Sequence, residues 1–136
     1  MIRDLMHDPI FLAQRSADAV PEDAETARDL LDTLRANADR CVGMAANMIG
    51  VSKRIIVFLD GAGYTTMYNP VILRCSGPYE TEEGCLSLSG TRRTRRYRSI
   101  RVQYCNEQFQ TRIKNYTDYT AQIIQHEIDH CSGILI

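Results

Sequence analysis

The sequence lacks an excess of charge of either sign. Lysine and arginine together number 16 and aspartate and glutamate 17, which leaves a formal net charge of −1. A chain this close to neutral has no global field that would attract nucleic acid or an anionic membrane. We therefore expect neither as a partner.

Long hydrophobic runs are also missing. The first twenty residues, MIRDLMHDPIFLAQRSADAV, never build an unbroken apolar stretch of signal-peptide or membrane-spanning length. Internal repeats, linkers and low-complexity segments are absent as well. With 136 residues, 44% of them apolar, the chain can form one modest core without disulfides or a membrane. We expect a single cytoplasmic domain over residues 1–136.

Cysteine is present, but not in the pattern of a disulfide framework. Five cysteines, an odd number, occur at irregular spacing at positions 41, 75, 85, 105 and 131. Free cysteines are usually small buried hydrophobic residues, so a metal-binding role needs local context. Only Cys85 has such context, because it lies in the segment Glu-Glu-Gly-Cys-Leu-Ser at residues 82–87.

Hydrophobic periodicity predicts an α+β fold. Helical spacing makes residues 23–38 an amphipathic surface helix. β-Branched and aromatic residues predict a hairpin from 54–59 and 64–68, ahead of Asn69-Pro70, and a further antiparallel pair at 100–105 and 109–114.

The last predicted helix runs from about Tyr119 to Cys131. Asp118 is its expected N-cap and Gly133 its expected left-handed terminator. Its apolar residues lie on more than one face, so it should be buried between other elements. The predicted fold therefore packs antiparallel or mixed β-sheets around this central helix.

The strongest chemical motif lies in the same helix, where residues 126–130 are His-Glu-Ile-Asp-His. The i, i+4 spacing puts both imidazoles on one helix face, where they can bind one metal ion together, with Glu127 beside it. Unpaired imidazoles would be costly to bury in so apolar a helix, which favours metal binding over an ordinary core role. A catalytic site of this kind needs a third protein ligand, and Cys85 on its glycine-flanked turn is the best candidate.

On these motifs the chain resembles the peptide deformylase family, which removes the formyl group from the N-terminal methionine of new polypeptides. Two family motifs are intact, Glu-Gly-Cys-Leu-Ser at residues 83–87 and Gln-His-Glu-Ile-Asp-His at residues 125–130. The first family motif, Gly-x-Gly-x-Ala-Ala-x-Gln, is matched in part by CVGMAANM at residues 41–48. Weaker likenesses extend the match from Arg3 to Gly133.

The resemblance implies a fold, a metal and a mechanism. One divalent ion would be held by Cys85, His126 and His130; it is ferrous iron in the family, with zinc or nickel as substitutes, and ligand softness alone does not rank these metals. Glu127 would take a proton from the attacking water and return it to the departing amine. The backbone N–H of Leu86 would help to hold the oxyanion.

The same resemblance implies an N-formyl-methionyl peptide as substrate. Arg92 and Arg96 approximately match positions that hold the peptide backbone in the family, and the turn before His126 helps to wall the methionine pocket. The predicted substrate-binding residues are Val42, Gly43, Arg92, Arg96, Tyr119 and Ile123.

Two departures from the family pattern bear on activity. Met48 replaces the glutamine whose side chain donates to the oxyanion in the family, and Asn47 could serve instead only if the local backbone shifted, because neighbours in an extended chain point to opposite faces. Losing one such donor typically costs on the order of 10²–10³ in rate, so we expect slowed turnover rather than none. Gln122, within the predicted pocket wall, either turns outward or changes the substrate preference.

Residues 91–101, TRRTRRYRSIR, contain six arginines. A basic run of this kind could bind RNA, but alternation along a strand favours a solvated face. The chain ends soon after the metal helix, so we expect no C-terminal extension of the type with which some deformylases dock on the ribosome.

Two alternatives to deformylation stay open at this point. One is a metal-dependent amidase for another N-acyl substrate, motivated by Met48 and Gln122. The other is a non-catalytic metal- or peptide-binding relative, against which Glu127 argues because a structural metal site has no use for a carboxylate beside the ion. The sequence does not indicate an oligomeric state.

Overall fold

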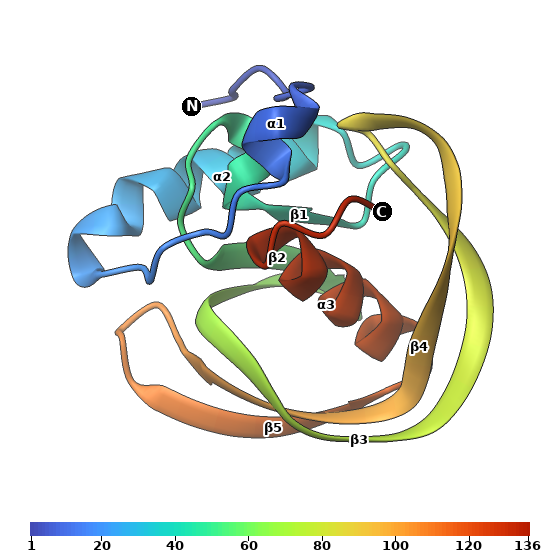
Figure 1. Ribbon diagram of the computed structural model, residues 1–136. Helices are drawn as coiled ribbons and strands as arrows, with labels where there is room; N and C mark the ends of the chain where they lie inside the picture. Colours follow the sequence, from blue (N-terminus) through green and yellow to red (C-terminus); the bar gives the residue numbers. More distant parts are fainter.

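A computed structural model of the protein describes residues 1–136 and contains one five-stranded sheet wrapped around a central helix (Figure 1). The strands follow chain order, and every neighbouring pair is antiparallel. The predicted α+β class is confirmed, and the sheet is antiparallel rather than mixed. Its elements are α1 (Pro9–Leu12), η1 (Pro21–Asp23), α2 (Ala24–Ala36), β1 (Gly43–Ala45), η2 (Ala46–Ile49), β2 (Ile55–Asp60), β3 (Gly63–Cys85), β4 (Leu88–Cys105), β5 (Thr111–Thr117) and α3 (Asp118–Cys131).

The strand β2 is buried on both faces. Its side chains alternate, so that Ile55 and Val57 pack toward α2 and η2 while Ile56 and Phe58 pack toward α3. The predicted hairpin between β2 and β3 is confirmed, with Gly61 in the left-handed region at its turn. The two helices thus cover opposite faces of one short strand. None of the helices has the length and apolar character needed to cross a membrane.

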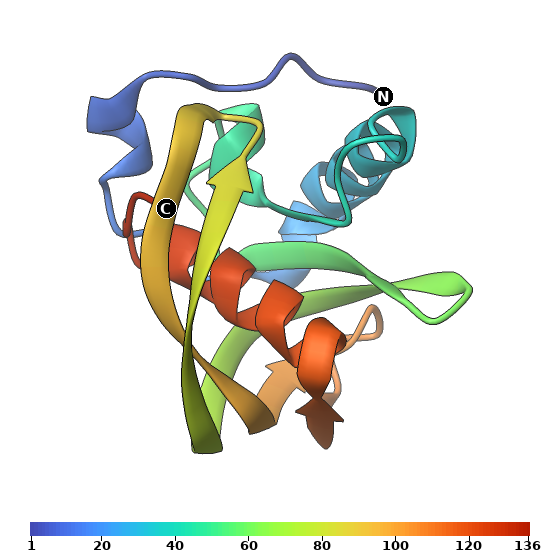
Figure 2. The same ribbon diagram turned by 90° about the vertical axis from the view of Figure 1, so that its right-hand side faces the viewer.

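The strands β3 and β4 form a long ribbon that the sequence did not predict. The Asn69-Pro70 pair was expected to end a strand, yet β3 runs through it and is 23 residues long in total. Register shifts lie between Tyr68 and Val71 and between Ile72 and Arg74, and Asn69 has a φ of 52°. Such bulges bend a strand and tolerate proline, so the ribbon curves around α3 instead of ending (Figures 1 and 2). This curvature carries the end of β3 to α3.

The helix α3 is the buried centre of the fold, as predicted. It packs against β1, β2, β4 and β5. The expected N-cap is wrong, because the helix begins at Asp118 itself, which has a φ of 54°, and no side chain caps this end. Asp118 makes the turn out of β5 with its backbone instead. Gly133 is confirmed as the left-handed residue after the helix, with a φ of 77°.

Candidate metal centre and active-site cleft

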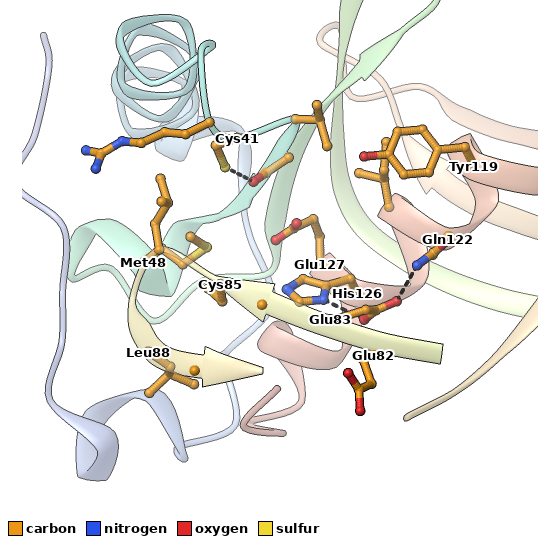
Figure 3. A pocket seen from close by; sticks show the side chains of 17 residues that line it. Cys41, Met48, Glu82, Glu83, Cys85, Leu88, Tyr119, Gln122, His126 and Glu127 are labelled. Atoms are coloured by element: carbon orange, nitrogen blue, oxygen red, sulfur yellow. Dashed lines mark hydrogen bonds and ion pairs between the residues drawn. The ribbon is translucent and has the colours of Figure 1, made fainter. Parts of the chain in front are cut away.

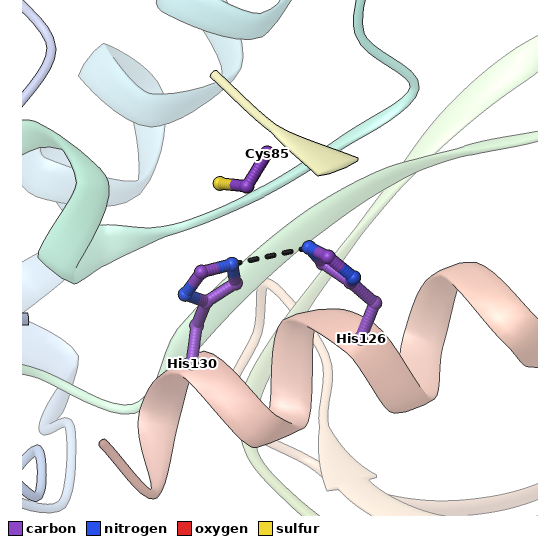
Figure 4. A group of neighbouring side chains, drawn as sticks. All are labelled: Cys85, His126 and His130. Carbon is purple, nitrogen blue, oxygen red and sulfur yellow. Dashed lines mark hydrogen bonds between the residues drawn. The ribbon is translucent and has the colours of Figure 1, made fainter. Parts of the chain in front are cut away.

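The two histidines of α3 face each other across one helix turn. His126 Nε2 and His130 Nε2 are 3.1 Å apart, and their ligand atoms lie with Cys85 Sγ within 4.8 Å of one another (Figure 4). Two imidazoles on one tetrahedral ion at ordinary bond lengths hold their nitrogens about 3.4 Å apart. The donor set therefore fits a single divalent ion. Cys85 reaches it from the end of β3, and Ser87 N–H donates to its sulfur at 3.5 Å.

The carboxylate of Glu83 fixes the tautomer of His126. Because a carboxylate only accepts, His126 Nδ1 donates to Glu83 Oε1 at 2.8 Å, and Nε2 is the ring nitrogen that would bind a metal. Burial alone would raise the pKa of Glu83, but hydrogen bonds from His126, Arg96 and Gln122 lower it to about 2. Figure 3 shows Glu83 between His126 and Gln122. His126, a predicted metal ligand, is thus oriented by a carboxylate that is charged at neutral pH.

Arg96 is not on a solvated face, contrary to the sequence prediction. It is 3% exposed, and its guanidinium pairs with Glu83 at 2.7 Å and with Asp129 at 2.6 Å. The strand places it inward because β4 curves around α3 and buries alternate residues. Its guanidinium is occupied by Glu83 on β3 and Asp129 on α3, which corrects its predicted role as a substrate contact. Arg92 is half-buried, donates to the carbonyl of Ser89 at 3.4 Å and does not line the cleft.

Glu127 lies buried beside the metal ligands with its Oε1 unpaired in the protein. Burial raises the pKa of this carboxyl to about 7, which suits a group that must both accept and donate a proton near neutrality. Gly43 allows its approach: a Cβ at position 43 would lie 2.9 Å from Glu127 Oε2 and 2.7 Å from Ile123 Cγ2. A side chain at position 43 would therefore displace Glu127 or Ile123.

A cleft of about 630 Å³ opens in front of these groups. It brings together most of the predicted residues, while Arg92 and Arg96 are absent from its lining and His130 lies beneath it, fully buried. Tyr119 stands at the rim, 62% exposed. The predicted residues that line the cleft are Val42, Gly43, Cys85, Leu86, Tyr119, Ile123, His126 and Glu127.

The free edge of β1 borders this cleft. The sheet order places β1 at its end, with β2 on one side only. Leu59 N–H donates to the Val42 carbonyl, so the peptide groups of the next residue, Gly43, point away from β2. The thiol of Cys41 donates to the Gly43 carbonyl at 2.9 Å. Burial raises the pKa of that thiol to about 11, so it stays protonated.

The end of the first motif is a 3₁₀ turn, not an extended segment. Met48 lines the cleft, and its sulfur accepts the Ala45 N–H at 3.5 Å. Asn47 is buried, and its amide donates to the His130 carbonyl at 2.8 Å. Asn47 therefore ties η2 to α3 and is not free to donate into the cleft. No side-chain amide of this motif faces the reacting groups.

Several residues at the site were missed by sequence reasoning. Arg40 and Glu82 line the cleft, and His7 makes a hydrogen bond of 3.1 Å with the Ser87 carbonyl, next to the metal-ligand turn. Arg40 directly precedes the first family motif, and this position could have indicated that it lines the cleft. The contact of His7 spans 80 residues and has no local pattern.

Two histidines one turn apart, a cysteine and a buried carboxylate beside an open cleft define a mononuclear metal-dependent hydrolase. The family pattern described as polypeptide deformylase matches residues 5–136. A peptide deformylase of Clostridium beijerinckii is 52% identical over 136 residues, the full length of both chains, and one of Desulfitobacterium hafniense is 38% identical over 87% of this chain and 78% of its own. The chain belongs to the peptide deformylase family.

Solved structures agree with this assignment. The peptide deformylase of Thermotoga maritima superposes with a TM-score of 0.89 at 28% identity, covering 99% of this chain and 95% of its own. A Met-Ala-Ser-bound peptide deformylase of Acinetobacter baumannii superposes equally well, with a TM-score of 0.89 at 25% identity, covering 99% and 97%. The expected family and fold are both confirmed. Members of the family remove the formyl group from the N-terminal methionine of new polypeptides.

Proposed function

We propose that the protein hydrolyses the formyl-amide bond of N-formyl-methionyl peptides in the cytoplasm, using one active site within a single domain of residues 1–136. The observation that carries this is Glu127, a buried carboxylate with an unpaired oxygen beside three converging metal-ligand atoms. A structural metal site would fill its fourth position and would not keep a carboxylate there. Membership of the deformylase family supplies the substrate class.

Cys85, His126 and His130 are the proposed ligands of one divalent ion, with ferrous iron as the resident metal by family likeness. When bound, the ion supplies Lewis-acid activation of water and of the formyl carbonyl. The residues present suit such an ion because Glu83 keeps one imidazole in the tautomer that ligates through Nε2. Zinc or nickel would fit the same donors.

Glu127 moves the proton. As a carboxylate it accepts one from the attacking water at Oε1, which has no competing donor in the protein. Its pKa of about 7 then allows the acid form to return that proton to the amine as the carbon–nitrogen bond breaks.

The oxyanion receives less help here than in the family pattern. Leu86 lines the cleft next to Cys85, and its backbone N–H is the proposed donor. Met48 offers none, and Asn47 is held by the His130 carbonyl. We therefore propose slowed turnover, because one missing oxyanion donor typically costs on the order of 10²–10³ in rate.

The peptide is proposed to lie along the free edge of β1. Gly43 presents its peptide groups there, and Val42, Tyr119 and Ile123 surround the methionine side chain. The Met-Ala-Ser ligand of the Acinetobacter baumannii structure supports a methionyl tripeptide as the unit bound.

Deformylation of formyl-Met-Ala-Ser by anaerobically prepared, ferrous-loaded protein tests this function. Turnover in the parent but not in Glu127→Gln, with equal metal content, is the expected result. Equal turnover on formyl-Met and formyl-Ala peptides would remove the methionine assignment. Metal bound without turnover on any formyl peptide would leave a binding protein instead.

A further inference from the structure

Three polar side chains link the surface of the ribbon to the metal centre. Tyr79 Oη donates to Gln122 Oε1 at 3.3 Å, and Gln122 Nε2 donates to Glu83 Oε2 at 2.9 Å. The other oxygen of Glu83 accepts from His126 Nδ1 at 2.8 Å. Arg98 lies over the Tyr79 ring, 5.1 Å from its centroid, on the outer side of this chain of contacts.

The direction of these hydrogen bonds follows from chemistry. Glu83 is ionised and only accepts, so the amide nitrogen of Gln122 must face it. The amide oxygen then faces Tyr79, whose hydroxyl must donate. No other assignment of the amide satisfies both neighbours.

Gln122, His126 and His130 are spaced four residues apart on α3, so they share one helix face. The carboxylate of Glu83 bridges the first turn of this row, with Oε1 on His126 and Oε2 on Gln122. Glu83 thus accepts hydrogen bonds from two successive turns of α3. Without Gln122 the carboxylate would keep its pairing with Arg96 but lose its second anchor on α3.

We propose that Gln122 is a positioning residue for the metal centre: supported by Tyr79, it sets the orientation of Glu83 and thereby of the ligand His126. The inference rests on the proposed metal site at Cys85, His126 and His130. It also accounts for a polar residue beside the methionine pocket, because the amide is directed at Tyr79 and Glu83. Gln122 therefore does not turn outward.

The variant Gln122→Leu tests this role, since it keeps the apolar stem and removes both hydrogen bonds. Loss of an outer partner of a metal-ligating histidine typically lowers metal affinity by 10- to 100-fold, and we expect about tenfold here because Arg96 still holds Glu83. The KM for a formyl-Met peptide should stay within about twofold while kcat falls at limiting metal. Tyr79→Phe, which removes only the outer contact, should lower affinity less.

The measurement is the Co²⁺ dissociation constant by chelator competition, together with the visible spectrum of the Co²⁺ protein, which reports ligand geometry without turnover. Gln108→Leu, at an exposed turn, is the matched control and should behave as the parent. An unaltered Co²⁺ affinity and spectrum in Gln122→Leu would overturn the proposal, as would a change in KM alone, which would make Gln122 a pocket residue. The metal-free Gln122→Leu variant should remain folded at the temperature of the binding measurement, so that a loss of affinity is not a loss of structure.

These outcomes are separable from failure of the proposed function. A parent that binds Co²⁺ but does not deformylate contradicts the proposed activity and leaves the role of Gln122 to be decided by affinity. A parent that binds no divalent ion contradicts both.

Discussion

The two walls of the cleft satisfy their polar groups in different ways. On the wall formed by α3 and the end of β3, Glu83 accepts hydrogen bonds from His126, Arg96 and Gln122. The other wall is formed by η2 and the segment before β1. There the Cys41 thiol already donates to the Gly43 carbonyl, and Met48 has a thioether, which cannot donate. The proposed metal ligands and the Met48 side chain therefore lie on different walls, and a substitution on one wall can leave the other unchanged.

The largest expected effect falls on the metal wall, at Glu127. Glu127→Gln keeps the size of the side chain and removes its basicity, so kcat should fall by about 10³-fold or more. Metal content, measured by elemental analysis, should stay at the parent's value because Glu127 is not a ligand. Retained turnover would exclude Glu127 from proton transfer.

The next effect tests how strongly that wall depends on its ion pair. Glu83→Gln leaves Asp129 as the only charged partner of the buried Arg96, and it leaves one amide oxygen where two carboxylate oxygens accept from His126, Arg96 and Gln122. Unfolding free energy should drop by about 3 kcal/mol, and metal affinity by about 10- to 100-fold. Denaturant titration and chelator competition measure the two losses.

Glu80→Gln is the control for this variant. Its ion pair with Arg93 is exposed, so the loss should stay below about 1 kcal/mol. If both variants lost the same stability, the buried ion pair of Glu83 would contribute no more to stability than an exposed one.

A smaller effect is expected where the two walls touch. Gly43→Ala puts a Cβ within 2.9 Å of Glu127 Oε2 and 2.7 Å of Ile123 Cγ2, so these side chains or the elements that carry them must shift. We expect a loss of about 1–3 kcal/mol in stability and a lower kcat. Gly63→Ala, where nothing lies within 4 Å, is the control. Equal activity in the two variants would show that Glu127 tolerates displacement.

The sequence predicted the metal wall better than the opposite one. His126 and His130 could be predicted because residues four apart lie on one face of a helix. Cys85 could be predicted because its motif is intact. The role of Arg96 could not be predicted, since its alternation on β4 indicates a solvated face and only the curvature of the ribbon turns it inward. That curvature comes from bulges at Asn69-Pro70, which sequence patterns treat as a strand end.

The opposite wall was predicted in composition but not in conformation. That Met48 cannot donate a hydrogen bond follows from its thioether, whatever the conformation. The expectation that Asn47 points away because the chain is extended had the wrong reason. The segment is a 3₁₀ turn, and Asn47 is held by a carbonyl 83 residues along the chain. A hydrogen bond between residues so far apart in the chain cannot be predicted from hydrophobic periodicity.

The smallest expected effect, and the only gain, is on this second wall. Met48→Gln restores an amide where Met48 lines the cleft, and we expect kcat on a formyl-Met peptide to rise by about tenfold, less than a full oxyanion donor supplies, because the surrounding wall has not adapted to it. Metal affinity should not change, since Met48 makes no contact with the Glu83 network.

Met48→Leu is the control for that gain, because it keeps an apolar side chain and adds no donor. The buried amide should cost Met48→Gln about 1 kcal/mol of stability when no substrate oxygen is present to accept from it. A substrate-dependent recovery of that stability would place the new amide at the oxyanion. Equal kcat in the Gln and Leu variants would mean that this wall takes no part in holding the oxyanion, and that the two walls are not two halves of one catalytic site.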